Sequence, residues 1–226
     1  MGIERGPKMV VPTTNLVLAL DAANTLSYPG SGATWTDLSG NGNNCTLVNS
    51  PTFDSANGGS IVFNGSTQYG SVANNTLLNS STQTISVWYN TTNNVLGRSA
   101  ILVGKTDASN SLNGYNLFGT GGAQIKNASS TTNVTGGTIT NSTWFNVTMT
   151  FTSGASALFY VNGTLAATTS IISFTISTQP MRIAISQDSF WTAFAGKIAK
   201  IDIYNTVLSA TDILQNYNSI KSRFGL

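Results

Sequence analysis

Apolar and polar residues alternate in short runs along most of this chain, and a period of two is typical of half-buried β-strands. In residues 144–151, Phe145, Val147 and Met149 fall on one face and threonines on the other, which predicts a central strand. The same reasoning predicts strands at residues 16–22, 60–63, 69–72, 84–89, 100–103, 115–118, 123–126, 157–161, 164–166, 181–185 and 199–203.

A strand that runs into a capped helix closes the pattern. In residues 199–203 the odd-numbered apolar side chains should face a core, while Lys200 and Asp202 should face water. The period then changes, because Ser209 offers an N-cap hydroxyl and Asp212 an acidic first turn. A short C-terminal helix is the simplest interpretation.

Turn formers separate these elements. Asn162-Gly163 suits the two positive-φ positions of a type I′ hairpin, and residues 35–44 hold so many Asn-Gly and Ser-Gly pairs that an irregular, hydrogen-bonded loop is expected. Residues 1–14 contain Pro7 and Pro12 and lack a period, which predicts an extended N-terminal arm. A disordered tail is the alternative.

Composition supports one all-β domain at residues 15–226. Only 8% of the 226 residues are charged and 40% are hydrophobic, while Asn, Ser, Thr and Gly fill the difference. The net charge of +2 comes without a Lys/Arg cluster, so no nucleic-acid partner is expected.

Trp88 and Trp144 belong to strands, and each is expected to be a core residue.

The N-terminal residues contain neither a signal peptide nor a membrane span, so production in a cytoplasm is expected. The single Cys45 cannot form an internal disulfide and is expected to be a small loop or core residue.

Five motifs follow one another in a characteristic order: FNGSTQY at 63–69, TISVW at 84–88, WFNVT at 144–148, LFYVNG at 158–163, and the stretch 194–209. In this order the sequence resembles the laminin G-like branch of the concanavalin A-like lectin and glucanase superfamily. The resemblance implies an antiparallel two-sheet jelly-roll sandwich whose first and last strands lie close together. The fold alone does not give the function.

A narrower resemblance is to the version of this module in tailed-phage structural proteins. There an opening like residues 16–23 (LVLALDAA) leads to a segment like residues 35–42 (WTDLSGNG). This resemblance implies a virion protein, made in the host cytoplasm and attached to other virion proteins, which we expect to occur through residues 1–14. Whether the chain forms a homo-oligomer is left open.

The residues needed for catalysis are missing. Glycosidases use a closely placed pair of carboxylates, but the only glutamate is Glu4 and no two aspartates are spaced by two in a strand. The chain has no histidine, which excludes the usual Ser-His and Cys-His arrangements and histidine metal sites. We therefore expect no enzymatic activity.

Calcium is the metal most compatible with Asp, Asn and backbone oxygens, and no other cofactor is expected. The candidate ligands are Asp37 and Asn41, with Asp21 as a third. The alternative, which we favour, is that Asp37 and Asn41 only hydrogen-bond the backbone of their own Gly-rich turn.

Sugar binding uses an exposed aromatic plane with amide or carboxylate partners. Tyr28, Trp35, Phe190 and Trp191 lie in predicted loops and are the candidates, although each could instead cover the sandwich core. Two functions follow: a non-enzymatic phage virion protein (head decoration, fibre or tail-associated module), or a lectin or adhesin module that recognises host-surface polysaccharide.

Overall fold

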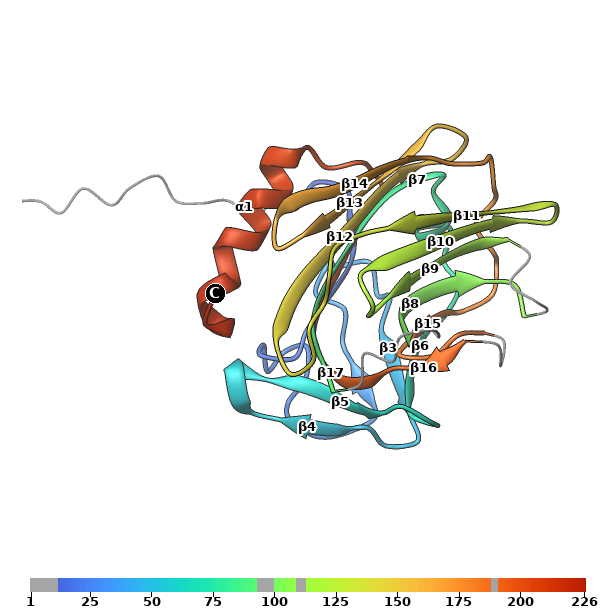
Figure 1. The fold of residues 1–226 in the computed structure, drawn as a ribbon. Helices are drawn as coiled ribbons and strands as arrows, with labels where there is room; N and C mark the ends of the chain where they lie inside the picture. Colours follow the sequence, from blue (N-terminus) through green and yellow to red (C-terminus); the bar gives the residue numbers. More distant parts are fainter. Residues whose placement is uncertain (1–11, 93–99, 109–112, 188–190) are drawn as a thin grey trace, which may run out of the picture.

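The computed structural model describes residues 12–92, 100–108, 113–187 and 191–226, which form two β-sheets packed face to face (Figure 1). The strands are β1 Leu16–Asp21, β2 Thr34–Trp35, β3 Cys45–Val48, β4 Thr52–Asp54, β5 Ser60–Asn64, β6 Tyr69–Val72, β7 Thr82–Thr91, β8 Ala100–Thr106, β9 Gly114–Phe118, β10 Gly122–Asn127, β11 Ser130–Thr135, β12 Trp144–Thr152, β13 Ser156–Val161, β14 Thr164–Ser170, β15 Met181–Ile183, β16 Thr192–Ala193 and β17 Ala195–Tyr204. The helices are α1 Ala210–Ile220 and the 3-10 turns η1 Ala56–Gly58, η2 Thr76–Asn79 and η3 Lys221–Phe224. None of these described helices is long and apolar enough to span a membrane.

The two sheets have simple neighbour orders. Sheet A runs β14-β13-β12-β7-β17-β5-β4, with β1 also paired to β17, and sheet B runs β11-β10-β9-β8-β15-β6-β3-β2. Among the described strands every pair is antiparallel except the short pair of β16 with β8. The predicted antiparallel sandwich with a short C-terminal helix is therefore confirmed, and the first and last strands, which were expected to lie close together, are paired.

The core between the two sheets consists of every second side chain along the interior strands. In β12 the side chains of Val147, Met149 and Phe151 are fully buried in this core, and Ile85 and Val87 of the neighbouring β7 join them. A period of two was sufficient to assign these faces because neither strand contains a bulge against the other.

The closing strand β17 departs from strict alternation. Its register against β7 shifts between Ile198 and Lys200, so Ala199 turns to the outer face of sheet A while Ile201 stays in the core. The prediction that Ala199 faces the core is wrong for this reason. Asp202 was also expected in water, yet it is buried beside Lys200, its ion-pair partner, and burial raises its pKa.

The C-terminal tail, which consists of α1, η3 and the last two residues (210–226), covers the outer face of sheet A (Figure 1). Trp88 stacks on Phe224, with ring centroids 4.5 Å apart, and on Tyr217 at 5.5 Å, while Trp144 lies 4.6 Å from Phe224. Both tryptophans are buried as predicted, but they form a second cluster under the tail rather than part of the core between the sheets.

Short sequence motifs fix the start of α1 and the hairpin turn on which α1 packs. Ser209 and Asp212 form the predicted capping box of α1. Asn162 and Gly163 join β13 to β14 with φ of 49° and 75°, as the Asn-Gly pair predicted. A Cβ on Gly163 would lie 3.1 Å from Tyr217, so the glycine also lets α1 pack closely on the turn.

Most of the predicted arm, residues 1–11, lies outside the described residues. Its last part is bound to the end of β17, because Tyr204 donates its hydroxyl to the carbonyl of Pro12 at 3.1 Å and the Asn205 amide donates to Asn15. Strict alternation in the strand predicted at residues 16–22 places Leu16 and Leu18 on one face. That prediction is wrong, because a register shift after Leu16 places Leu18 in the core while Leu16 packs beside Tyr204.

Candidate functional site

Two of the four aromatic residues proposed for sugar binding face the interior. Trp35 lies in β2 and is fully buried in the main core, so its indole is not presented to a ligand. Tyr28 is 3% exposed, donates its hydroxyl to the Gly32 carbonyl at 3.0 Å, and packs 5.6 Å from the ring of Phe53. Trp35 and Tyr28 are therefore not exposed rings for a sugar, and for both the alternative holds, in which the ring covers the sandwich core.

Asp37 organises the turn that was considered for calcium. One carboxylate oxygen accepts the amides of Ala19 and Ser39, and the other accepts the amide of Asn43 and the Ser39 hydroxyl, at 2.7–3.0 Å. Asn41 donates its side-chain amide to the Leu16 carbonyl and to Ser39. The bonds of Asp37 with Ser39 and Asn43 are those of the hydrogen-bonded alternative, whereas the bonds to Ala19 and Leu16 go beyond it and tie the turn to β1.

Asp21, the third candidate ligand, is held elsewhere. Its carboxylate accepts the guanidinium of Arg223 at 2.8 Å and the amide of Ala23 at 3.0 Å. Within the described part of the chain, no three acidic, Cys or His side chains lie close enough together to hold a metal ion. Calcium binding stays a prediction that these contacts do not favour.

Trp191 lies on the outer side of sheet B, and Phe190 lies outside the described residues. The indole of Trp191 is half-buried and packs against Phe118 of β9, with ring centroids 4.8 Å apart and planes inclined by 47°. Four strands, β8, β15, β6 and β3, lie between β9 and β2, so Trp191 and Trp35 belong to opposite ends of the sheet. Trp35 and Trp191 therefore do not belong to one site.

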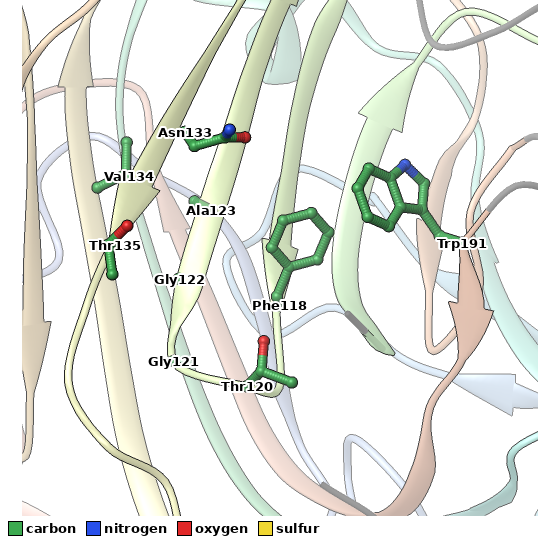
Figure 2. Close-up of a pocket in the computed structure, with 9 residues that line it drawn as sticks. All are labelled: Phe118, Thr120, Gly121, Gly122, Ala123, Asn133, Val134, Thr135 and Trp191. Carbon is green, nitrogen blue, oxygen red and sulfur yellow. The ribbon is translucent and has the colours of Figure 1, made fainter. Parts of the chain in front are cut away.

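A cavity of about 380 Å³ opens beside the Phe118–Trp191 pair. Figure 2 shows the two rings on one side of it and β11 on the other, with the β9–β10 turn between them. The described residues that line it are Phe118, Thr120, Gly121, Gly122, Ala123, Asn133, Val134, Thr135 and Trp191. We call this the aromatic pocket.

Glycines shape the floor of the aromatic pocket. A Cβ on Gly122 would lie 2.8 Å from the Val134 carbonyl, and one on Gly121, where φ is +88°, would lie 2.2 Å from the Gly137 carbonyl. Both positions therefore require glycine, because neighbouring backbone occupies the space that a Cβ would need. The glycines let the β9–β10 turn and β11 pack closely at the base of the aromatic pocket.

The walls of the aromatic pocket combine apolar rings with neutral polar groups. Asn133 and Thr135 are exposed on β11, and Gln124 of β10 donates to the Asn133 side-chain oxygen at 3.0 Å. None of the described lining residues is ionisable. The arrangement can stack an apolar surface and hydrogen-bond hydroxyl groups, and it offers neither an acid–base pair nor a countercharge.

Sequence reasoning found Trp191 but missed Phe118, Asn133 and Gln124. Residues 115–118 and 123–126 were predicted as strands, and the polar side chains that alternate with their core residues were a usable signal for an outer face. Which of those side chains meets Trp191 depends on strand pairing between distant parts of the sequence.

Comparison with known proteins identifies the fold family. The family model described as the concanavalin A-like lectin/glucanases superfamily, in its laminin G form, matches residues 64–214. The chain belongs to this superfamily. A search of curated proteins found no significant match.

Solved structures with this lectin-like fold include proteins that bind carbohydrates. The binding domain of Paraclostridial mosquitocidal protein 1 superposes with a TM-score of 0.72 at 20% identity, over 92% of this chain and 52% of that one. Domain 4 of AbnA, a GH43 extracellular arabinanase from Geobacillus stearothermophilus solved with arabinotriose, gives 0.70 at 15% identity, over 88% and 97%. Trypanosoma rangeli sialidase in complex with sialic acid gives 0.68 at 14%, over 95% and 34%. The chain thus spans about half the length of the toxin binding domain, and these likenesses concern the superfamily fold alone.

Proposed function

We propose that this protein is a non-enzymatic carbohydrate-binding module that holds a neutral glycan in the aromatic pocket. The observation that carries the proposal is the half-buried Trp191 indole, packed on the buried Phe118 ring and facing the Asn133 amide and the Thr135 hydroxyl across one pocket. A sugar has an apolar C–H face that packs on aromatic rings and hydroxyl groups that need hydrogen-bonding partners. Arabinotriose, bound by a domain of the same fold, is a neutral ligand of this kind.

The absence of charge among the described lining residues favours neutral over anionic sugars. A carboxylate, such as that of the sialic acid bound by the sialidase, would lose water here without gaining a cationic partner. We infer that sialylated glycans bind more weakly than neutral ones. The same lack of ionisable groups supports binding without hydrolysis, since glycosidases need a pair of carboxyl groups.

Replacing Trp191 tests this function. Trp191→Ala should lower the affinity for arabinotriose, or for neutral glycans on an array, by roughly tenfold, because a stacking surface is lost. Isothermal titration measures the Kd, and Leu26→Ala, which removes a side chain that is 78% exposed in another loop, should leave it unchanged. Equal binding by wild type and Trp191→Ala, or a preference for sialylated glycans, would contradict the proposal.

A second candidate function is a structural role in a phage virion, and the specific observation concerns the opening segment. Residues 16–23 and 35–42, which carry the resemblance to phage modules, form one hydrogen-bonded unit, in which Asp37 accepts the Ala19 amide and the Leu38 amide donates to the Ala19 carbonyl. The two parts of the resemblance are thus joined in space. A virion protein displaying a glycan-binding sandwich would combine both candidate functions, with avidity from many copies.

Removing residues 1–11 tests the virion role. The deletion keeps Pro12 and Asn15, which bind the end of β17, so the sandwich should still fold. We expect the shortened protein to stop joining purified particles in a sedimentation assay while its circular dichroism and glycan affinity stay unchanged. Normal incorporation would exclude anchoring through the arm, and failure of the full chain to join particles would exclude the virion role.

A further inference from the structure

Three amide side chains form a row across the outer face of sheet B. Asn116 in β9 is paired in register with Gln124 in β10, which is paired with Asn133 in β11. Their neighbours along the strands, such as Leu117 and Ile125, point into the core, so the three amides share the opposite face. Asn133 at the end of the row lines the aromatic pocket.

The hydrogen bond within this row has a direction. Gln124 donates through Nε2 to Oδ1 of Asn133 at 3.0 Å. Because this bond holds the Asn133 oxygen toward Gln124, the other end of the planar amide, Nδ2 with its two donors, is the end directed away from Gln124 and offered to a ligand. Gln124 is 8% exposed, whereas Asn133 is exposed, so the buried amide sets the orientation of the accessible one.

The bond to Asn133 is what orients the Gln124 amide. The Gln124 Oε1 is buried and has no hydrogen-bonding partner among the described residues, and both polar atoms of the buried Asn116 on its other side are in the same state. Asn116 therefore does not select a direction for Gln124, and the direction rests on the contact with Asn133.

We propose that Gln124 is a positioning residue that fixes Asn133 as a hydrogen-bond donor to the aromatic pocket, so that the bound glycan must offer an acceptor oxygen at this point. A ring oxygen, a glycosidic oxygen or a methylated hydroxyl satisfies Asn133 as well as a free hydroxyl does. The inference deepens the proposed glycan-binding function and rests on it for the identity of the ligand.

The direction of the bond is measurable without any ligand. In the free, isotope-labelled protein, an NMR experiment that detects coupling across hydrogen bonds should connect the Gln124 Nε2 nitrogen with the Asn133 Cγ carbon. Coupling between Asn133 Nδ2 and the Gln124 Cδ carbon, or coupling in neither direction, would overturn the proposal. This readout decides the positioning role even if glycan binding fails.

Gln124→Glu tests the consequence for recognition. At pH 8 the carboxylate can only accept, so it should draw in Asn133 Nδ2 and turn the Asn133 oxygen toward the pocket. The ratio of the Kd for per-O-methylated arabinotriose to that for arabinotriose should then rise by roughly five- to tenfold relative to wild type, since methylation removes the donors that an oxygen needs.

A matched control exists in sheet A. Gln83 in β7 is fully buried, donates through Nε2 to the carbonyls of Leu78 and Ser80, and also has a buried Oε1 without a partner in the described part of the chain. Gln83→Glu should change stability and leave the Kd ratio unchanged. An unchanged ratio in Gln124→Glu would refute the positioning role, whereas correct NMR coupling with no binding of any neutral glycan by wild type would refute the proposed function alone.

Discussion

A buried cation holds two loops of the sandwich together. Lys105 in β8 is fully buried, and its ammonium donates to Asn74 Oδ1 and to the carbonyls of Ser177 and Gln179, each at 2.8 Å. All three acceptors are neutral, so no opposite charge offsets the loss of water. Burial therefore lowers the pKa of Lys105 to about 8.

This shift predicts a rise in stability with pH. Between about pH 8 and the ordinary lysine pKa near 10.5, the unfolded chain binds the proton more tightly than the folded one, so unfolding becomes less favourable as pH increases. From pH 8 to 9.5 we expect a gain of about 1–2 kcal/mol in the unfolding free energy, measured with urea. Lys105→Met should lose this pH dependence.

Lys126→Met is the control for this experiment. Lys126 lies half-buried in β10 and its replacement removes one lysine without touching the two loops, so the rise with pH should persist. An unfolding free energy of the wild type that does not change with pH would show that burial costs the Lys105 ammonium little hydration free energy.

At the scale of elements, the C-terminal tail links β1 to the segment before β5 in sheet A. Arg223 donates to Asp21 at the end of β1 and to the carbonyls of Asn57 and Gly59 near β5, at 2.6–2.8 Å. The next residue, Phe224, fills the space between the two buried tryptophans. The tail thus joins the first and last parts of the chain and keeps water from an aromatic surface.

Phe224→Ala should destabilise the protein by about 2–4 kcal/mol, since it empties a buried aromatic site at the edge of the fold. Chemical denaturation followed by tryptophan fluorescence measures the change, and Trp88 and Trp144 are two of the four tryptophans that give the signal. Leu226→Ala, at a position 40% exposed, should shift stability by less than about 0.5 kcal/mol. Equal stability of the two variants would mean that the tail covers the sheet without stabilising it.

At the scale of the whole molecule, the edge strands of the two sheets lie side by side on one flank. β14 ends sheet A, β11 ends sheet B, and the two strands are in contact (Figure 1). Neither strand contains a charged residue or a proline. Lysine and proline are the usual protection against edge-to-edge association, so this flank is open to pairing with another chain.

Thr168→Lys places a charge in the middle of β14, where the side chain is exposed. We expect slower aggregation on mild heating, measured by light scattering, with the unfolding free energy changed by less than about 0.5 kcal/mol. Thr211→Lys adds the same charge on the exposed surface of α1 and should not slow aggregation. Equal rates in both variants would indicate that net charge rather than the edge controls association.

Much of the architecture followed from local patterns. Alternation in β7 and β12 predicted their core faces, Asn162-Gly163 predicted a hairpin, and Ser209 with Asp212 predicted the start of α1. Each of these signals acts between residues that are close in the chain. The bulges in β1 and β17 were not predictable in this way, because an extra residue is accommodated only against a particular partner strand.

The sequence by itself therefore determined the strands, the turns and the closing helix, since periods, turns and caps are local, and the order of its motifs gave the resemblance that implies the antiparallel sandwich. Tertiary structure decided which aromatic side chains cover the core and which meet a pocket: Trp35 and Trp191 both follow turn-rich segments, yet the former is fully buried and the latter meets Phe118. It also decided that Gln124 orients Asn133. These outcomes depend on contacts between strands that are distant in sequence, and no local pattern encodes such contacts.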